Sequence, residues 1–416
     1  MVGLGKLGLP CLLAMEKHGQ HEVFGFDISP KVQDEISKRS VSYWEADVNE
    51  YLLDSDITLV ASPEDLVSNC DIIFVAVQTP HDPKYEGRDL VPDTRKDFDY
   101  SHLKTSISAL AKGLMQFPNS NPQIVVISTV LPGTMNSEVL PILRSARADF
   151  RFAYNPYFIA MGTTIFDFMN PEFLLIGGNS DRELDDLANF YSFIPCEKKK
   201  MRIESAELTK VAYNTFIGFK IVFANALAEI VEKRGGDVDE VTSALADAKY
   251  RIMSGAYMKA GMGDGGGCHP RDQIAMSWLA KDANMSIDIF EFIAVARDAQ
   301  TRRQAEYIVA ECKESNLEAV LLGISYKPNS PLDVGSPARL LENILISMKH
   351  DPLVYDPWVY PDRELPRDKP YVYFISSRHD DFKNLELIED SIIIDPWGVV
   401  EAVGIGTKLI KPGRPE

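Results

Sequence analysis

The chain has 416 residues, too many for one hydrophobic core, so we expect two or three domains. Its composition, 45% hydrophobic and 25% charged, is that of a globular protein, and a formal charge of −18 argues against nucleic acid or an anionic membrane as the main partner. Five scattered cysteines and the lack of a long apolar run favour a cytoplasmic protein without disulfides or membrane spans, and no metal site is expected.

The first half of the chain alternates short β-branched runs with helical patterns, which predicts βαβ units and a parallel sheet. The expected strands cover residues 22–27, 57–61, 71–77, 123–128, 151–154 and 173–176. Residues 81–100 form an irregular stretch rich in charge and proline. A loop of this length is either functional, as a lid or flap over a substrate, or disordered, and the sequence leaves both possibilities open.

The middle of the chain is predicted to be helical. One long helix is expected over residues 205–234, and it is apolar on nearly every face, as in a spine between domains or a subunit interface. Shorter helices are expected over 238–248 and 272–282. After a polar connection near 297–303, strands resume at 319–325, 352–356, 370–375 and 391–395.

The predicted fold class is therefore α/β, with two Rossmann-like, doubly wound domains joined by a long central helix and a small helical domain. The three domains are expected to cover residues 1–195, 196–300 and 301–416.

The sequence Gly3-Leu4-Gly5-Lys6-Leu7-Gly8 fits the dinucleotide fingerprint, in which glycines allow a tight turn, close approach of a pyrophosphate and helix packing. A helix pattern follows, and the next strand ends at Asp27. A carboxylate there accepts hydrogen bonds from ribose hydroxyls and would repel a 2′-phosphate, so NAD is favoured over NADP. Only Met1 and Val2 precede the loop, so either the first strand is short or the start is truncated or mis-assigned.

A second glycine-rich segment, residues 261–267, ends at Cys268, directly before a predicted helix. A helix N-terminus lowers the pKa of a thiol and can stabilise an oxyanion. Asp272 follows one turn later and can reach back towards the thiol. A lone cysteine is more often a small buried hydrophobic residue, but the surrounding glycines make packing a poor explanation.

Lys210 and Asn214 are spaced i, i+4 on the long helix and therefore share a face. A lysine and an amide on an otherwise apolar helix need partners, and a substrate hydroxyl or oxyanion would serve. The alternative is a lysine that extends to solvent beside an amide bonded within the protein.

Over essentially its whole length the chain resembles the UDP-glucose/GDP-mannose dehydrogenase family. The motifs of the family occur in order, and they are Gly3–Gly8, Val77-Gln78-Thr79-Pro80, Ser128-Thr129-Val130-Leu131-Pro132-Gly133-Thr134, Asn155-Pro156, Glu207-Leu208-Thr209-Lys210 with Asn214, the Cys268 loop with Asp272, and Lys327-Pro328-Asn329.

This resemblance implies an NAD-dependent, four-electron oxidation of the C6 alcohol of a UDP-sugar, UDP-glucose or a UDP-N-acetylhexosamine, in polysaccharide biosynthesis. By the resemblance, Cys268 is the nucleophile that forms a thiohemiacetal and then a thioester. Lys210 and Asn214 stabilise oxyanion charge, Asp272 assists proton transfer, and Thr129 positions water or the lysine.

The resemblance also implies the binding residues and the assembly. The first domain would bind NAD, the last the nucleotide sugar, and the long helix would form a homodimer. The cofactor residues would be Gly3, Gly5, Lys6, Leu7, Gly8, Asp27, Thr79 and Thr129. The substrate residues would be Asn155, Tyr157, Lys210, Asn214, Tyr257, Gly265 and Lys327.

Three segments depart from the family pattern. Both glutamates of the family's Asn-Pro-Glu-Phe-Leu-x-Glu-Gly motif are replaced, by Tyr157 and Met161. A cofactor-associated arginine after Lys-Pro-Asn is missing, and Asp264 and His269 replace an aromatic and an apolar residue in the cysteine loop. Hydrolysis of a thioester then lacks its usual base, unless Asp272, His269 or another residue substitutes.

Two other functions remain open on the sequence. One is a two-electron dehydrogenase of the 3-hydroxyacid type, which shares a Rossmann domain and a helical spine, although Cys268 and the third domain argue against it. The other is a catalytically impaired sugar-nucleotide-binding protein, which the missing glutamates and the short first strand would suit.

Overall fold

The computed structural model describes the chain except residues 81–95, 255–259, 264, 267, 268, 413, 415 and 416, and the description also leaves out some side chains of the long helices, including those of His269 and Asp272. Contacts divide the chain into two compact units, Met1–Gly218 and Phe219–Glu416. The boundary falls within helix α9 (Ile203–Arg234), and the division into three domains stays a prediction.

The first unit is built on a five-stranded sheet of order β3-β4-β5-β6-β7. The first three strands are parallel to one another, whereas β6 pairs antiparallel with β5 and parallel with β7, so the expected parallel sheet has a mixed edge. The strands are β3 (Ile72–Val75), β4 (Gln123–Val126), β5 (Arg151–Tyr154), β6 (Phe173–Gly177) and β7 (Glu197–Met201).

The first strand of the chain is reduced to one bridging residue. Val2 forms parallel bridges with Phe26 on one side and Val75 on the other, and so joins β3 to the pair β1 (Phe24–Gly25) and β2 (Thr58–Leu59). The backbone of Met1 and Val2 accepts hydrogen bonds from Phe26 and Ala76 at 2.9 and 2.8 Å. The strand is therefore short here, and these bridges and hydrogen bonds still join it to both of its neighbours.

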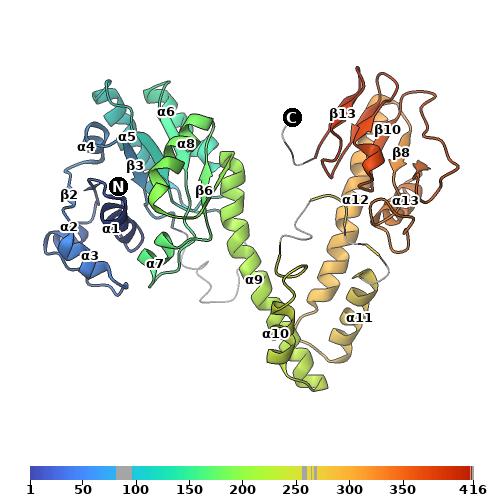
Figure 1. Cartoon of the computed structure of the whole chain (residues 1–416), viewed down its shortest axis with the longest axis horizontal. Helices are drawn as coiled ribbons and strands as arrows, with labels where there is room; N and C mark the ends of the chain where they lie inside the picture. Colours follow the sequence, from blue (N-terminus) through green and yellow to red (C-terminus); the bar gives the residue numbers. More distant parts are fainter. Residues whose placement is uncertain (81–95, 255–259, 264, 267–268, 413, 415–416) are drawn as a thin grey trace. The chain divides into compact units, whose positions relative to one another are not determined.

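Alternating side chains of this sheet pack into two separate hydrophobic cores, one on each face. Ile73 and Val75 face one core and Phe74 the other, because successive strand residues point to opposite faces. Helices α1 and α7 contribute to the core with Phe74, and α4, α5 and α6 contribute to the opposite core, which makes the unit doubly wound (Figure 1). The helices of this unit before α9 are α1 (Gly8–Gly19), α2 (Pro30–Ser37), α3 (Val48–Asp54), α4 (Pro63–Asn69), α5 (Ser101–Gln116), η2 (Met135–Val139), α6 (Leu140–Ala146), α7 (Thr164–Met169), α8 (Asp181–Phe190) and η3 (Tyr191–Phe193).

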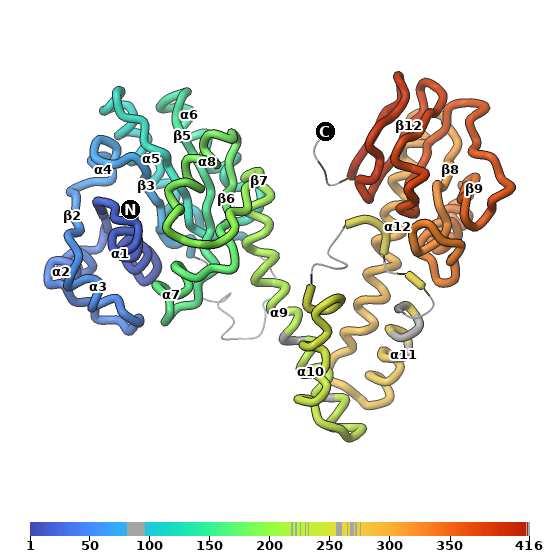
Figure 2. Tube along the Cα trace, viewed as in Figure 1, coloured from blue at the N-terminus to red at the C-terminus, as the bar shows by residue number. Residues whose placement is uncertain are grey.

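The second unit contains another five-stranded sheet, fully parallel, of order β14-β12-β10-β8-β9. Figure 2 labels its strands β8, β9 and β12. One face packs on the helices α12 and α13, and the other on η4 and the small β11–β13 pair. The elements are α12 (Ile289–Ser315), β8 (Ala319–Leu322), α13 (Pro337–Ser347), β9 (Leu353–Tyr355), β10 (Val372–Ile375), η4 (Asp380–Phe382), β11 (Asn384–Leu385), β12 (Ile392–Ile394), β13 (Ala402–Val403) and β14 (Lys408–Ile410).

The helical middle differs from the expectation at one point. The polar connection predicted near 297–303 is wrong, because α12 runs through it without a break. Most of its polar residues are exposed on the helix, whereas Thr301 is buried and donates its hydroxyl to the Arg297 carbonyl oxygen. The second half of α9 packs on α11 (His269–Asp282) and α12 through Ala226, Ala280 and Phe290, and α10 (Val238–Ala246) follows α9. Among the described residues, no helix combines the length and apolarity needed to cross a membrane.

Candidate active site

The glycine loop before α1 has the geometry of a phosphate cradle. Gly3 has a φ of +89°, and a Cβ there would lie 2.9 Å from the Ala76 carbonyl oxygen. A Cβ on Gly8 would lie 2.0 Å from the Gly3 carbonyl oxygen, so both glycines are required by close packing. A Cβ on Gly5 would meet nothing within 4 Å, so this backbone faces open space. The residues present therefore fit a dinucleotide whose pyrophosphate approaches at Gly5.

Asp27 follows β1 beside this loop. One carboxylate oxygen accepts the Leu4 amide and the other the Ser29 amide, each at 2.8 Å. Because each oxygen has a second lone pair, the half-buried carboxylate can still accept from ribose hydroxyls. Lys6 is exposed and Leu7 half-buried in the same turn.

The ends of β3 and β4 are joined next to the glycine loop. The Thr79 hydroxyl donates to the Thr129 carbonyl oxygen at 2.7 Å, and the Ser128 hydroxyl donates to the Val77 carbonyl oxygen at 2.5 Å. The structure thus brings together two predicted cofactor residues that are 50 positions apart. Both lie at the carboxyl edge of the sheet, where open α/β sheets bind ligands.

Glu207, on the first turns of α9, holds the loop that follows Thr129. Its two carboxylate oxygens accept the amides of Gly133 and Met135 at 2.6 and 2.7 Å, at the start of η2. Burial raises the pKa of this carboxyl, against the lowering effect of the two amides. Sequence reasoning placed Glu207 in a motif without giving it this role, although an acid on a buried helix turn is a usable signal.

Lys210 lies one turn further along α9 and is only 8% exposed. Its ammonium group donates to the Tyr157 carbonyl oxygen at 2.7 Å and lies 4.8 Å from the centroid of the Phe158 ring. Burial lowers the pKa of this amine. Asn214, one turn later, is exposed. Lys210 is thus not a lysine extended to solvent, and the buried cation is available to an oxyanion.

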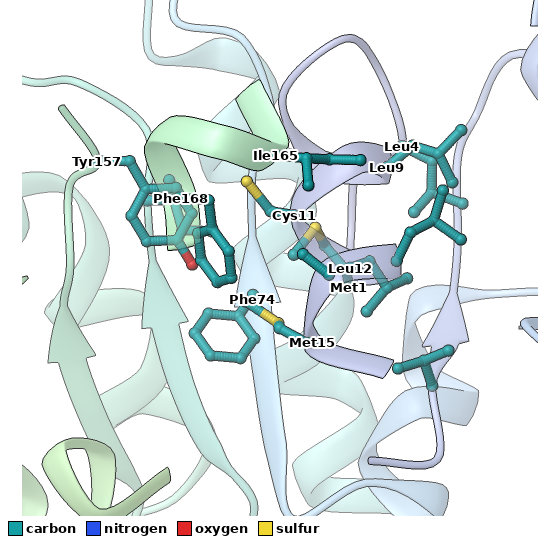
Figure 3. Close-up of a cluster of buried hydrophobic side chains, with 14 of the residues drawn as sticks. Met1, Leu4, Leu9, Cys11, Leu12, Met15, Phe74, Tyr157, Ile165 and Phe168 are labelled. Carbon is teal, nitrogen blue, oxygen red and sulfur yellow. The ribbon is translucent and has the colours of Figure 1, made fainter. Parts of the chain in front are cut away.

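Asn155 and Tyr157 are placed differently from what a substrate contact requires. The Tyr157 side chain is 7% exposed and packs against Phe168 and the helix that carries Cys11 (Figure 3). Its hydroxyl shares a 2.7 Å hydrogen bond with Tyr191, which donates to the Asn155 side-chain oxygen at 2.7 Å. Both side chains belong to the core, and in the described structure only the backbone of Tyr157 contacts Lys210.

Two carboxylates organise the segment after Phe158. Glu45, which sequence reasoning missed, is buried and accepts the amides of Gly162 and Thr164 at 2.9 and 2.7 Å. Asp167 accepts the Ala160 amide at 2.9 Å. Glu45 thus binds the amide of the first residue of α7, and Asp167 reaches back to the loop before the helix. Met161, at a position of a missing glutamate, is exposed. The loop is therefore held by acids that come from outside the family motif.

In the second unit, the glycine segment before Cys268 packs on the loop that follows β8. The Gly266 amide donates to the Gly335 carbonyl oxygen at 3.2 Å. Gly266 has a φ of +93°, and a Cβ there would lie 3.0 Å from the Tyr326 ring, while one on Gly265 would lie 2.6 Å from Pro337. These two glycines are thus needed for close approach. Cys268, Tyr257 and Asp264 lie outside the described residues, as does the Asp272 side chain, but α11 begins at His269 as expected.

Lys327 lies in the same loop after β8, at the carboxyl edge of the second sheet. Its side chain is exposed, and its carbonyl oxygen accepts hydrogen bonds from the hydroxyls of Ser325 and Ser330 at 3.0 and 2.9 Å. The structure therefore places the expected substrate lysine on a fixed turn.

The chain is similar in sequence to known proteins over most of its length. The model of the NAD binding domain of the UDP-glucose/GDP-mannose dehydrogenase family matches residues 1–194, and the model of the family's central domain matches residues 204–298. The UDP-glucose 6-dehydrogenase of Rickettsia conorii is 26% identical over 409 residues, which cover 95% of this chain and 88% of that protein. The GDP-mannose 6-dehydrogenase of Pseudomonas putida is 26% identical over 380 residues, which cover 89% of this chain and 83% of that protein.

A solved structure shares the fold over nearly the whole chain. The ternary complex of GDP-mannose dehydrogenase from Pseudomonas aeruginosa superposes with a TM-score of 0.84 and 22% sequence identity, covering 98% of each chain. The expected α/β fold class is confirmed by this likeness, and the NAD-binding character of the first domain by the family model.

Proposed function

Because the two family models together match well over half of its length, the chain belongs to the UDP-glucose/GDP-mannose dehydrogenase family of NAD-dependent oxidoreductases that act on CH–OH groups, and we propose that it oxidises the C6 alcohol of a UDP-sugar to the acid. The reaction removes four electrons in two steps and passes through an aldehyde and a thioester on Cys268. UDP-glucose and UDP-N-acetylhexosamines are the substrates to test first.

The observation that carries this proposal is the buried ammonium group of Lys210. A cation that is 8% exposed, bonded to a backbone carbonyl and placed over an aromatic ring has lost most of its hydration. Such a charge stabilises a developing oxyanion more strongly than a hydrated lysine would. Oxidation of an alcohol through a covalent thiol intermediate forms an oxyanion, and the Lys210 ammonium group would supply the positive charge that stabilises it.

The glycine cradle and Asp27 would hold NAD, which supplies the hydride acceptor when bound. The Cys268 thiolate would form a carbon–sulfur bond with the aldehyde, and Lys210 and Asn214 would stabilise the oxyanion of the thiohemiacetal. Loss of a hydride from this carbon leaves the thioester. Asp272 would then accept a proton from the attacking water, and Thr129 would position that water or the lysine.

The hydrolysis step is assigned to Asp272 because the family glutamates are absent. Tyr157 directs its side chain into the core, and Met161 has no ionisable group. We therefore expect Asp272→Asn to form the thioester and release the acid slowly. Rapid quench of one turnover, followed by mass spectrometry of the intact chain, would reveal the sugar bound to Cys268. Full-rate release of acid by this variant would transfer the role to another residue.

The stoichiometry of the reaction tests the whole proposal. Purified protein is incubated with NAD and a panel of UDP- and GDP-sugars, and the NADH formed per sugar consumed is counted. Two NADH per sugar supports the four-electron reaction. One would indicate the two-electron alternative, and none across the panel would indicate an impaired binding protein.

The role of the thiol is tested by Cys268→Ser, with Cys196→Ser as the control. Cys196 is a half-buried cysteine outside the proposed site. We expect the first variant to lose carboxylate formation and the second to retain it. Carboxylate formation by Cys268→Ser at the wild-type rate would contradict the mechanism.

We further propose that the protein is a homodimer formed through α9. Leu208, Phe216 and Ile217 are 55%, 50% and 44% exposed in the single chain. Large apolar side chains exposed along one helix favour burial against another chain. This would explain why the helix is apolar on nearly every face.

A further inference from the structure

Three strand ends of the second sheet meet at the point where its topology reverses. From β8 the chain passes to β9 on one side and then to β10 on the other. Asp356, directly after β9, is fully buried and accepts the backbone amides of Ile324 and Ser325, which follow β8, at 2.6 and 3.1 Å. A crevice at such a reversal is the common ligand site of open α/β sheets.

His379, which follows β10, completes this junction and is fully buried. Its Nδ1 accepts the Asn329 backbone amide at 2.8 Å, so this nitrogen carries no proton and the proton is on Nε2. Nε2 lies 3.2 Å from the Asp356 carboxylate and 3.1 Å from the Ser325 hydroxyl, and donates to both. The Ser325 hydroxyl in turn donates to the Lys327 carbonyl oxygen at 3.0 Å.

These residue types also occur in hydrolytic triads, but the geometry here is different. In a triad the acid and the serine hydroxyl bind opposite nitrogens of the imidazole, so that one nitrogen can take the serine proton. Here both share Nε2, which already carries a proton. Ser325 is also only 1% exposed. The cluster therefore holds backbone in place and has no means of activating Ser325.

The turn between Ser325 and Ser330 is fixed by this cluster at two points. Nδ1 of His379 holds the amide of Asn329, and the proton on Nε2 holds Lys327 through Ser325. The Asn329 side chain adds a pair of hydrogen bonds to Asp380, at 2.5 and 3.0 Å. Hydrogen bonds from His379 and backbone amides outweigh burial and hold the pKa of Asp356 below its usual range, so the carboxylate stays charged. The exposed side chain of Lys327 leaves this turn at a defined place.

We propose that His379 is a positioning residue for the nucleotide part of the substrate, because its neutral, Nε2-protonated ring fixes the turn that presents Lys327. This rests on the proposed function in one respect, namely that Lys327 contacts the nucleotide sugar. His379 itself touches no substrate. Its effect is therefore on binding, and the chemistry at Lys210 and Cys268 is unaffected.

Two substitutions distinguish the contribution of Nδ1 of His379 from that of Nε2. His379→Gln places a donor near the position of Nε2 but offers no acceptor to the Asn329 amide. His379→Asn places an acceptor near Nδ1 and loses the donor to Asp356, which keeps its backbone amides. We expect His379→Gln to raise the KM for the sugar nucleotide and the Kd for UDP or GDP about tenfold, with kcat within about twofold, because the Asn329 amide loses the acceptor that fixes the turn. His379→Asn should restore most of the affinity.

The measurements are titration calorimetry of the full-length chain with UDP and with GDP, steady-state kinetics, and long-range ¹H–¹⁵N spectra of the histidines. The spectra of the wild type should show one ring locked in the Nε2-protonated form. Equal losses of affinity in both variants, a fall in kcat at unchanged Kd, or a wild type that binds neither nucleotide would overturn the inference. If no sugar is oxidised but His379→Gln still weakens nucleotide binding, the proposed reaction fails and the positioning role stands.

Discussion

The ammonium group of Lys210 lies in surroundings that disfavour its charge. Within the described part of the chain it donates to the Tyr157 carbonyl oxygen and has an aromatic neighbour, and its side chain is only 8% exposed. Glu207, one turn earlier, uses both carboxylate oxygens on backbone amides, so it does not neutralise the lysine directly. The helix thus carries Glu207, which binds the loop at Gly133 and Met135, and Lys210, whose ammonium group is bound, among the described residues, only by neutral groups.

Burial lowers the pKa of Lys210 below its ordinary value of 10.5, which sets a pH dependence of stability. Between the folded pKa and 10.5 the unfolded chain binds more protons than the folded chain, so this group makes the free energy of unfolding rise with pH in that window. Lys210→Met should abolish this rise. Denaturant titrations of wild type and variant from pH 7 to 10.5 measure it.

The matched control is Lys220→Met, which removes an exposed lysine from the same helix. It should leave the pH profile of the wild type unchanged. A wild-type profile that is parallel to that of Lys210→Met over the whole range would show that the amine is hydrated.

At the scale of elements, the two glycine segments have a common cause. Gly3 is needed because the loop packs on the backbone of Ala76 after β3, and Gly8 because the start of α1 packs on the Gly3 carbonyl. Gly266 is needed because the segment before Cys268 packs on the Tyr326 ring. In both cases the missing side chain lets the main chain approach a neighbour closely, and it leaves the backbone N–H groups of the segment accessible to a ligand. Gly5 alone in the first loop faces open space.

Gly5→Ala and Gly8→Ala therefore form a matched pair. Gly8→Ala puts a methyl group 2.0 Å from the Gly3 carbonyl oxygen and should destabilise the fold by about 1–3 kcal/mol. Gly5→Ala should fold normally but bind NAD at least about tenfold more weakly, because the methyl group would occupy the space of the pyrophosphate. Thermal denaturation and NAD titration measure the two effects. Wild-type NAD affinity in Gly5→Ala would place the cofactor elsewhere.

At the scale of the whole molecule, the exposed apolar residues of α9 carry the expectation of a dimer. Phe216→Glu places a charge where another chain is expected to bury a ring, and should yield monomers. Ile405→Glu is the control, because Ile405 is 96% exposed on the β14 side of the second unit. Light scattering after gel filtration gives the mass of each variant. A wild type that elutes as a monomer would rule out the dimer.

Local patterns in the chain predicted the α/β fold class, an NAD-binding first domain and the family, because periodic hydrophobicity and glycine spacing act over short stretches of chain. The sequence also placed the helix starts near Ser205 and Cys268. It misjudged residues 297–303, because polarity there marks an exposed helix face as readily as a break.

The orientation of the site residues, by contrast, depends on how distant elements pack together. The motif predicts that Tyr157 contacts substrate, yet its side chain lies in the core. There the Tyr157 hydroxyl forms a hydrogen bond with the Tyr191 hydroxyl. Glu207 meets Gly133 across 74 positions, and His379 meets Asn329 across 50. Such partners are set by the packing of distant elements, and that packing is not encoded in the spacing within any single motif.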